Sequence, residues 1–202
     1  MSTQKCQQET VSFRHDVWKK QPMIFLTEPD IKYQDSFLVG LREFHQEGRM
    51  LQYDFQIISE DFERFLYHLK TQQDRTKLPP YIVPQSHFWL IDDNEFIGIL
   101  SLRRELNDTF IRIGGHIGYQ VRPSKCRRGY GKELLRRGLQ KAKELGFTRV
   151  LLTCDEDNIA SKKIIESNGG QFENMIRVEG SPIKKLRYWI DLGDQPPVEK
   201  GH

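Results

Sequence analysis

The chain has 202 residues, of which 37% are hydrophobic and 29% are charged, and its net charge is +3. This length suffices to bury a stable core without disulfides or a structural metal, and the proportions are those of an ordinary soluble protein. The small positive charge does not indicate nucleic-acid binding, and apolar runs such as residues 88–91 are far too short to cross a bilayer.

The three cysteines are odd in number and far apart in the sequence. They match neither a disulfide framework nor the spacing of zinc ligands, so we expect no metal site and a reducing compartment, the cytoplasm. Residues 1–6 have no apolar stretch behind their positive charge, and we therefore expect no secretory signal.

We expect one domain over residues 23–192, with a polar N-terminal arm over residues 1–22 and a tail over residues 193–202. The domain begins with a short apolar strand at residues 23–26. Two helices follow, one with Asp35 as its cap and one over residues 59–69 with Ser59 as its cap. Their apolar residues recur at helical spacing: Phe37, Leu38, Leu41 and Phe44 in the first, and Phe62, Phe65, Leu66 and Leu69 in the second.

Beyond Pro79 and Pro80 the pattern changes to strands. Residues 86–91 and 95–102 are predicted to pair as a hairpin, because Asp92-Asp93-Asn94 between them has the composition of a tight turn. A third strand is predicted over residues 111–121, where apolar and polar side chains alternate.

The second half alternates strands and helices. A helix is predicted over residues 129–145, ended by Gly146, followed by a strand over residues 149–154 and a short helix over residues 158–167. Two final strands are predicted at residues 171–173 and 186–192. This order indicates an α/β fold with a mixed sheet.

Residues 121–132 join the third strand directly to the long helix. The first turn of a helix has unpaired N–H groups and a positive dipole end, and Arg127, Arg128 and Lys132 add full charges there. Gly129 and Gly131 let a ligand approach the backbone, which favours a diphosphate. The alternative is a tight turn whose glycines serve geometry alone. The pattern is neither a dinucleotide fingerprint, which needs a third glycine, nor a Walker loop.

The segment Cys126-Arg127-Arg128-Gly129-Tyr130-Gly131 resembles motif A of the GNAT acetyltransferases, Gln/Arg-x-x-Gly-x-Gly/Ala after a strand. Cys126 departs from this pattern, because the family usually has Gln or Arg at the first position. The departure affects one side-chain contact with the coenzyme and leaves the backbone amides unchanged.

A second segment is similar to motif B of the same family: Asn158, the small residue Ser161, Glu166 and Gly169. Residues 114–170 together resemble a bacterial branch of predicted acetyltransferases. The resemblance implies the acyl-CoA N-acyltransferase fold, in which a mixed central sheet splays between two central strands and carries helices on both faces. Here the two strands are residues 113–121 and 149–154.

The resemblance also implies the reaction. The donor is acetyl-CoA, the acceptor is a primary amine, and attack is direct in a ternary complex without a covalent enzyme intermediate. The backbone of Tyr119 and Val121 is expected to pair with the pantetheine arm, and Asn158 and Ser161 to contact that arm. Cys126 lies beside the pyrophosphate, whose expected ligands are the amides of Arg127, Arg128, Gly129, Tyr130, Gly131 and Lys132.

The residues that act as general acid and general base are less clearly indicated than those that bind the coenzyme. The family often places a tyrosine acid seven residues after the motif-B asparagine, where this chain has Ile165, so Tyr119 and Tyr130 are the alternatives. The family position of the base falls near Gly115, and His116 beside it has a suitable ordinary pKa of about 6.5. Glu105 and Asp108 are further candidates. The competing interpretations are a structural histidine and turn-forming acids.

The amine acceptor is a small molecule or a protein, and we expect neither nucleic acid nor membrane as a partner. A homodimer is compatible with the sequence. The alternative functions are a CoA-binding protein of the same fold with little or no turnover, and transfer of another acyl group. Cys126, flanked by two arginines, is predicted to react with alkylating agents faster than Cys154 and to be protected by bound CoA.

Overall fold

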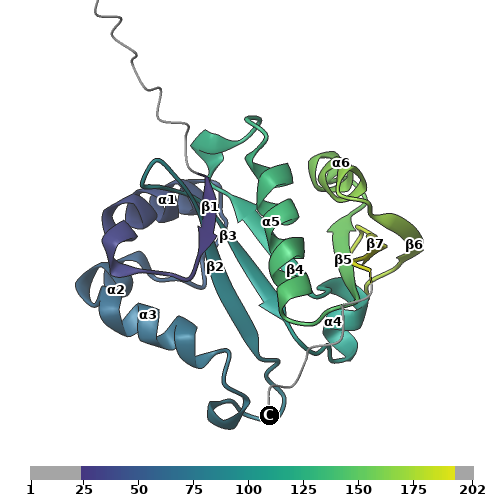
Figure 1. The fold of residues 1–202 in the computed structure, drawn as a ribbon, viewed down its shortest axis with the longest axis horizontal. Coiled ribbons are helices and arrows are strands. Elements are labelled where there is room, and N and C mark those ends of the chain that lie inside the picture. Colours follow the sequence, from purple (N-terminus) through teal and green to yellow (C-terminus); the bar gives the residue numbers. More distant parts are fainter. Residues whose placement is uncertain (1–23, 194–202) are drawn as a thin grey trace, which may run out of the picture.

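The computed structural model describes residues 24–193, in which seven strands form two antiparallel sheets (Figure 1). The four-stranded sheet has the order β1 (Phe25–Thr27), β2 (Gln85–Asp92), β3 (Glu95–Arg103) and β4 (Ile117–Val121). The three-stranded sheet has the order β5 (Arg149–Asp155), β7 (Lys185–Asp191) and β6 (Gln171–Ile176). The predicted arm and nearly all of the predicted tail lie outside the described residues, so those boundaries stay predictions.

The predicted hairpin is confirmed. Asp92 pairs with Glu95, and the two residues between them, Asp93 and Asn94, have φ of +46° and +63°. Two successive residues with positive φ are typical of the two-residue turns that match the twist of paired strands, and Asp and Asn tolerate this conformation.

Three helices cover one face of the four-stranded sheet: α1 (Gln34–Gln46), α2 (Phe55–Glu60) and α3 (Phe62–Thr71) (Figure 1). They enclose an aromatic core, in which the ring of Phe37 stacks on Trp89 with centroids 4.6 Å apart. Burial of such large apolar side chains is the main force that holds these helices on the sheet.

Two predicted helix starts are wrong. Asp61 interrupts the helix predicted over residues 59–69, and its carboxylate accepts a hydrogen bond from the N–H of Arg64 at 2.9 Å, so it caps α3. Ser59 instead lies inside α2. Asp35 lies in the first turn of α1, whereas Asp30 caps the short 3₁₀ turn that precedes that helix.

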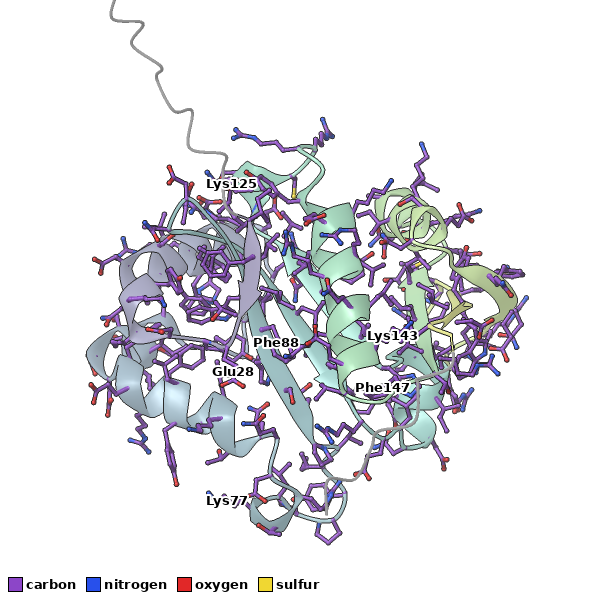
Figure 2. All side chains as sticks on the ribbon, viewed as in Figure 1. Glu28, Lys77, Phe88, Lys125, Lys143 and Phe147 are labelled. Carbon is purple, nitrogen blue, oxygen red and sulfur yellow. The ribbon has the colours of Figure 1, made fainter. Side chains whose placement is uncertain are left out.

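The other face of the sheet packs against α5 (Tyr130–Glu144), whose buried residues include the predicted Leu134, Leu135, Leu139 and Ala142 (Figure 1). Gly138 allows close contact, because a Cβ there would lie 2.2 Å from a methyl carbon of Leu100. Phe88 of β2 belongs to the same buried cluster, and Figure 2 labels it together with Lys125 and Phe147, which lie in the segments before and after the helix.

The strand predicted over residues 111–121 is wrong in its first third. Residues Asp108–Ile113 form the helix α4, capped by Asn107, whose side chain accepts a hydrogen bond from the N–H of Phe110 at 3.0 Å. The alternating isoleucines fit either structure, and the cap decides for a helix. The chain then turns at Gly115, with φ of +64°, and β4 begins at Ile117.

The C-terminal half follows the predicted order. The helix α6 (Ile159–Ser167) begins after Asn158, whose side chain accepts a hydrogen bond from the N–H of Ser161 at 2.9 Å. The strand β6 is three residues longer than predicted, because it pairs with β7 up to Ile176. The strands β4 and β5, joined through α5, run the same way on either side of the gap between the two sheets (Figure 1).

Candidate functional site

The outer edge of β4 is the starting point of the site. The N–H of Arg103 donates to the carbonyl of His116 at 2.8 Å, and the N–H of Arg122 donates to the carbonyl of Ile97 at 2.9 Å. Because bonding to one neighbour alternates along an antiparallel strand, the backbone groups of Ile117, Tyr119 and Val121 point away from β3. They face β5, which belongs to the other sheet and forms no ladder with β4, so these groups are available to pair with an extended ligand.

A single junction closes the lower end of the gap between the two sheets. The N–H of His116 donates to the carbonyl of Leu151 at 2.8 Å, and the strands separate beyond this point into two sheets. A side chain at Gly115 would place its Cβ 2.4 Å from that same carbonyl oxygen. Glycine at 115 is therefore required by the approach of β5, and this explains why no side chain is present there.

The upper end of the gap leads to the N-terminus of α5. Gly129 precedes the helix with φ of +85°, a left-handed conformation that favours glycine. Within residues 24–193, the N–H groups of Gly129, Tyr130, Gly131 and Lys132 donate no hydrogen bond to another residue. These amides and the helix dipole can hold an anion.

Three cationic residues lie in the same short segment as these amides. Arg127, Arg128 and Lys132 are all exposed, and in the described part of the chain none of them forms an ion pair. Arg127 itself adopts a positive φ of 61°, so the loop turns sharply just before Gly129. Free charges beside unpaired amides fit a ligand with several negative oxygens.

Gly131 also lies at a helix–helix contact. A Cβ at this position would lie 2.6 Å from the terminal methyl carbon of Ile164 on α6. This glycine lets α5 and α6 pack closely. Tyr130, beside it, donates its hydroxyl to a carboxylate oxygen of Asp92 at 2.5 Å, and this hydrogen bond raises the pKa of Tyr130 to about 12.

Tyr119 and Ser161 connect β4 to α6 across the gap. Their hydroxyl oxygens are 3.0 Å apart, and Ser161 in turn is placed by the cap at Asn158. Burial raises the pKa of Tyr119 to about 12, although the hydrogen bond with Ser161 acts in the opposite direction. The structure thus brings three of the residues predicted for the coenzyme arm into one connected set.

His116 lies at the junction of β4 and β5. Its Nδ1 accepts a hydrogen bond from the N–H of Leu151 at 2.8 Å, and its ring packs against Phe147 and Trp189. Burial lowers the pKa of His116. With Nδ1 occupied, the neutral ring carries its proton on Nε2, so this geometry does not support a role as general base.

The predicted acids lie apart from the gap. Glu105 forms an exposed ion pair with Arg75, and Asp108 is exposed in the first turn of α4. Ile165, where the family often has a tyrosine, is fully buried in the core. None of these three residues is placed to exchange a proton at the β4 edge.

The two described cysteines differ in exposure. Cys126 is exposed in the loop before α5, and its Sγ lies 3.6 Å from the carbonyl oxygen of Arg122. Cys154 is buried on β5, and burial raises its thiol pKa. Both are free thiols.

A cleft of about 320 Å³ opens beside β4 on the face of Gln120, whose side chain points away from the face that carries the Tyr119 side chain. Its walls come from the loop after α1 and from β2, β3 and β4. The polar side chains that line it include Tyr53, Gln85, His87, Ser101, Arg103 and Gln120. Among the described residues, no aspartate or glutamate lines it.

Sequence reasoning did not identify these cleft residues. A signal was present, because Ser101 and Arg103 occupy alternate positions of a largely apolar strand, on the face shared with Ile99. Polar residues at every second position mark a face that is not fully covered by core.

The described residues contain no group of three or more His, Cys, Asp or Glu side chains that could hold a metal ion. Within the same range, none of the helices is both long enough and apolar enough to span a membrane.

Comparison with known structures shows the fold. Mycobacterium smegmatis RimJ, in complex with CoA-disulfide, is 18% identical with a TM-score of 0.62, covering 83% of this chain and 81% of its own. A Salmonella typhimurium acetyl transferase that modifies the N-terminal serine of ribosomal protein L7/L12 is 16% identical with a TM-score of 0.58, covering 83% and 94%. The microcin C7 self-immunity acetyltransferase MccE, in complex with acetyl-CoA and AMP, is 14% identical with a TM-score of 0.57, covering 83% and 92%.

No curated protein matches the sequence. The family model described as the acetyltransferase (GNAT) domain matches residues 39–171, well over half of the 202 residues. Its span includes α5 with the unpaired amides, the β4 edge and the Tyr119–Ser161 contact. The chain therefore belongs to the GNAT family and is an N-acetyltransferase that uses acetyl-CoA as its acetyl donor.

Proposed function

We propose that the protein transfers the acetyl group of acetyl-CoA to a primary amine by direct attack in a ternary complex. The amine nitrogen attacks the thioester carbonyl carbon, the C–S bond breaks, CoA leaves as its thiolate, and the amine loses a proton. The observation that carries this proposal is the pair of unpaired backbone groups that one short segment joins: the edge of β4 that faces away from β3, and the four amides at the start of α5.

The donor site follows from these two groups. The backbone of Tyr119 and Val121 pairs with the pantetheine arm, and the amides from Gly129 to Lys132 hold the pyrophosphate. Arg127 and Arg128 add charge beside it, while Asn158 positions Ser161 at the arm. Holding the thioester and the amine side by side supplies much of the acceleration.

Proton transfer requires little from the protein. A thiol has an ordinary pKa of about 8.5, so a thiolate can depart near neutral pH without a strong acid. Tyr119, whose pKa is about 12, stays protonated at neutral pH and donates a hydrogen bond to the leaving sulfur. Since no carboxylate of the described residues lines the cleft, the amine loses its proton to water.

The acceptor binds in the cleft on the other face of β4. Among the neighbours, one modifies the N-terminal serine of a ribosomal protein, and another is known in complex with acetyl-CoA and AMP. The acceptor here is accordingly a small molecule or a protein. The free thiols Cys126 and Cys154 support the cytoplasm as the proposed location.

A second candidate is a CoA-binding protein with little turnover. The buried Ile165 and the absence of a side chain at Gly115 favour it, because these are the positions where the family often has its acid and its base.

One experiment separates the two functions. Thiol release from acetyl-CoA is measured with a panel of primary amines while both substrates are varied. Intersecting initial-rate lines support the ternary complex, and parallel lines contradict it by indicating an acetylated enzyme. Tight CoA binding by calorimetry without release above the amine-free rate supports the binding protein instead.

A further inference from the structure

Arg103 is a half-buried cation without a carboxylate partner in the described part of the chain. Its Nη1 donates to the carbonyl of Gly115 at 3.3 Å, and its guanidinium lies 4.1 Å from the ring centroid of Phe110. Its Nε is buried and has no hydrogen-bond acceptor. Burial lowers the pKa of Arg103, as expected for a charge taken from water without a counter-ion.

Two neighbouring cleft residues also present donors. The side-chain oxygen of Gln120 is occupied by Arg49, whose Nε and Nη2 donate to it at 3.2 and 3.1 Å. Its NH₂ group, and the hydroxyl of Ser101, have no partner among residues 24–193. The cleft therefore offers unused donors together with the guanidinium.

The charge state of His87 also affects the electrostatic field of the cleft. Burial, and after it the positive charges of Arg103 and His68, lower the pKa of His87 to about 4. His87 and Arg103 line the same cleft. A cleft with a net positive field and no acidic lining residue attracts anions and repels polycations.

We propose that the amine acceptor carries an anionic group, a carboxylate or a phosphate, which is bound in this cleft by Arg103 together with Ser101 and Gln120. The inference rests on the proposed function, because it assigns the substrate class of the same transferase site. Arg103 contacts Gly115 where β4 meets β5, so an anion bound to it lies beside the strand that holds the thioester.

The test uses matched pairs of amines with the full-length protein and saturating acetyl-CoA. Glycine is compared with glycinamide, and phosphoethanolamine with ethanolamine; spermidine and a neutral dipeptide amide complete the panel. We expect kcat/KM to be about ten- to a hundredfold higher for one or both anionic members, the range of a charged hydrogen bond. Glycinamide has the less basic amine, so amine basicity cannot produce a preference for glycine.

Variants assign the preference to the residue. In Arg103→Met, the ratio of kcat/KM for the anionic amine to kcat/KM for its neutral counterpart should fall close to one in each pair. Arg103→Lys should retain part of this preference. Arg104→Met is the matched control, because it removes an exposed positive charge from the adjacent residue, which does not line the cleft. Equal rates within both pairs, a preference for spermidine or the dipeptide amide, or an unchanged ratio in Arg103→Met would each overturn the proposal.

A binding measurement keeps this inference separate from the proposed function. N-acetylglycine and N-acetylglycinamide are titrated into CoA-saturated protein by calorimetry. If no amine in the panel releases thiol, the proposed function fails, but binding of the acetylated anion that is lost in Arg103→Met still supports the anion site. Equal binding of the two compounds, or binding unaffected by Arg103→Met, overturns it.

Discussion

Arg122 is bound to Glu43 across the interface between the β4–α5 loop and α1. Its Nε donates to a carboxylate oxygen at 2.8 Å, its Nη2 lies 2.7 Å from the same oxygen, and the other oxygen accepts the N–H of Ser124 at 3.0 Å. Arg122 also donates to Glu95 at 2.9 Å. The loop that leads to the unpaired amides is therefore held by a largely buried ionic network.

Glu43→Gln is expected to lower the free energy of unfolding by about 2 kcal/mol, because it leaves the buried guanidinium of Arg122 with a weaker partner. Urea unfolding measures the loss. Glu47→Gln, which breaks an exposed ion pair with Arg49, is the control and should change stability by less than about 0.5 kcal/mol. Equal losses of unfolding free energy in the two variants would show that the ionic network around Arg122 does not stabilise the protein more than an exposed ion pair does.

The same contact has a pH signature. Burial acts to raise the pKa of Glu43, but the hydrogen bonds from Arg122 and Ser124 outweigh it and hold this pKa below the ordinary 4.5. Because the pKa of Glu43 is lower in the folded protein than in the unfolded chain, its carboxylate stabilises the fold above pH 4.5. This stabilisation is lost as the pH falls through the pKa that Glu43 has in the folded protein. The stability difference between wild type and Glu43→Gln should therefore shrink on acidification below that pH.

Gly129→Asp is expected to abolish CoA binding while the protein stays folded. The new carboxylate would lie beside the amides that hold the pyrophosphate and repel it. Gly146→Asp is a matched control at the other end of α5, since both glycines have a left-handed φ, of +85° and +90°, and neither Cβ would meet an atom within 4 Å. Calorimetry should show unchanged CoA affinity for this control; similar losses in both variants would contradict the assigned site.

Tyr119→Phe tests the hydrogen bond proposed for the leaving sulfur. Because this interaction forms as charge develops on sulfur, kcat should fall about tenfold while the KM for acetyl-CoA changes little. Ser161→Ala removes the other hydroxyl of the pair and leaves the phenol in place, so a smaller effect is expected. Steady-state kinetics with a thiol reagent measure both. An unchanged kcat in Tyr119→Phe would remove the phenol from the mechanism.

Much of this site could be predicted from sequence because its chemistry is local. Unpaired amides occur at any helix N-terminus, and the residues 127–132 place glycines and cations at one. The cap at Asn158 is likewise a property of a few consecutive residues. Such features depend on spacing along the chain, so a sequence alone can indicate them.

The remaining features depend on contacts between distant segments. Gly131 lies against the side chain of Ile164 of α6, and Nδ1 of His116 accepts a hydrogen bond from the N–H of Leu151 of β5. Neither partner is adjacent in the sequence. The cleft around Arg103 combines a loop with three strands, so no single segment contains its pattern. The helix at residues 108–113 was missed because alternating isoleucines fit a strand equally well.

Cys126 is expected to be alkylated much faster than Cys154, because it is exposed whereas Cys154 is only 5% exposed and burial raises its thiol pKa. CoA should protect Cys126, which lies in the loop directly before the pyrophosphate site. Mass spectrometry of peptides after brief iodoacetamide treatment, with and without CoA, measures both effects. Equal labelling of Cys126 with and without CoA would count against the location of the coenzyme.

His87 is expected to make the folded protein sensitive to mild acid. Its pKa is lowered from 6.5 to about 4, chiefly by burial, so the unfolded chain binds a proton at a higher pH than the folded protein does. Stability is therefore complete above pH 6.5 and falls as the pH decreases toward 4, by about 3 kcal/mol for this group. The pKa of His116, also lowered by burial, acts in the same direction.

His87→Gln removes this titration and should flatten the dependence of the unfolding free energy on pH between 4 and 6.5. Urea unfolding at a series of pH values measures the slope. His68→Gln, an exposed position on α3, is the comparison and should retain most of the wild-type slope, because burial is the main cause of the lowered pKa of His87 and the charge of His68 the smallest of the three. If His87→Gln kept the full wild-type pH dependence of the unfolding free energy, that dependence would come from other groups. The assumption that His87 is a neutral side chain of the cleft would then be wrong.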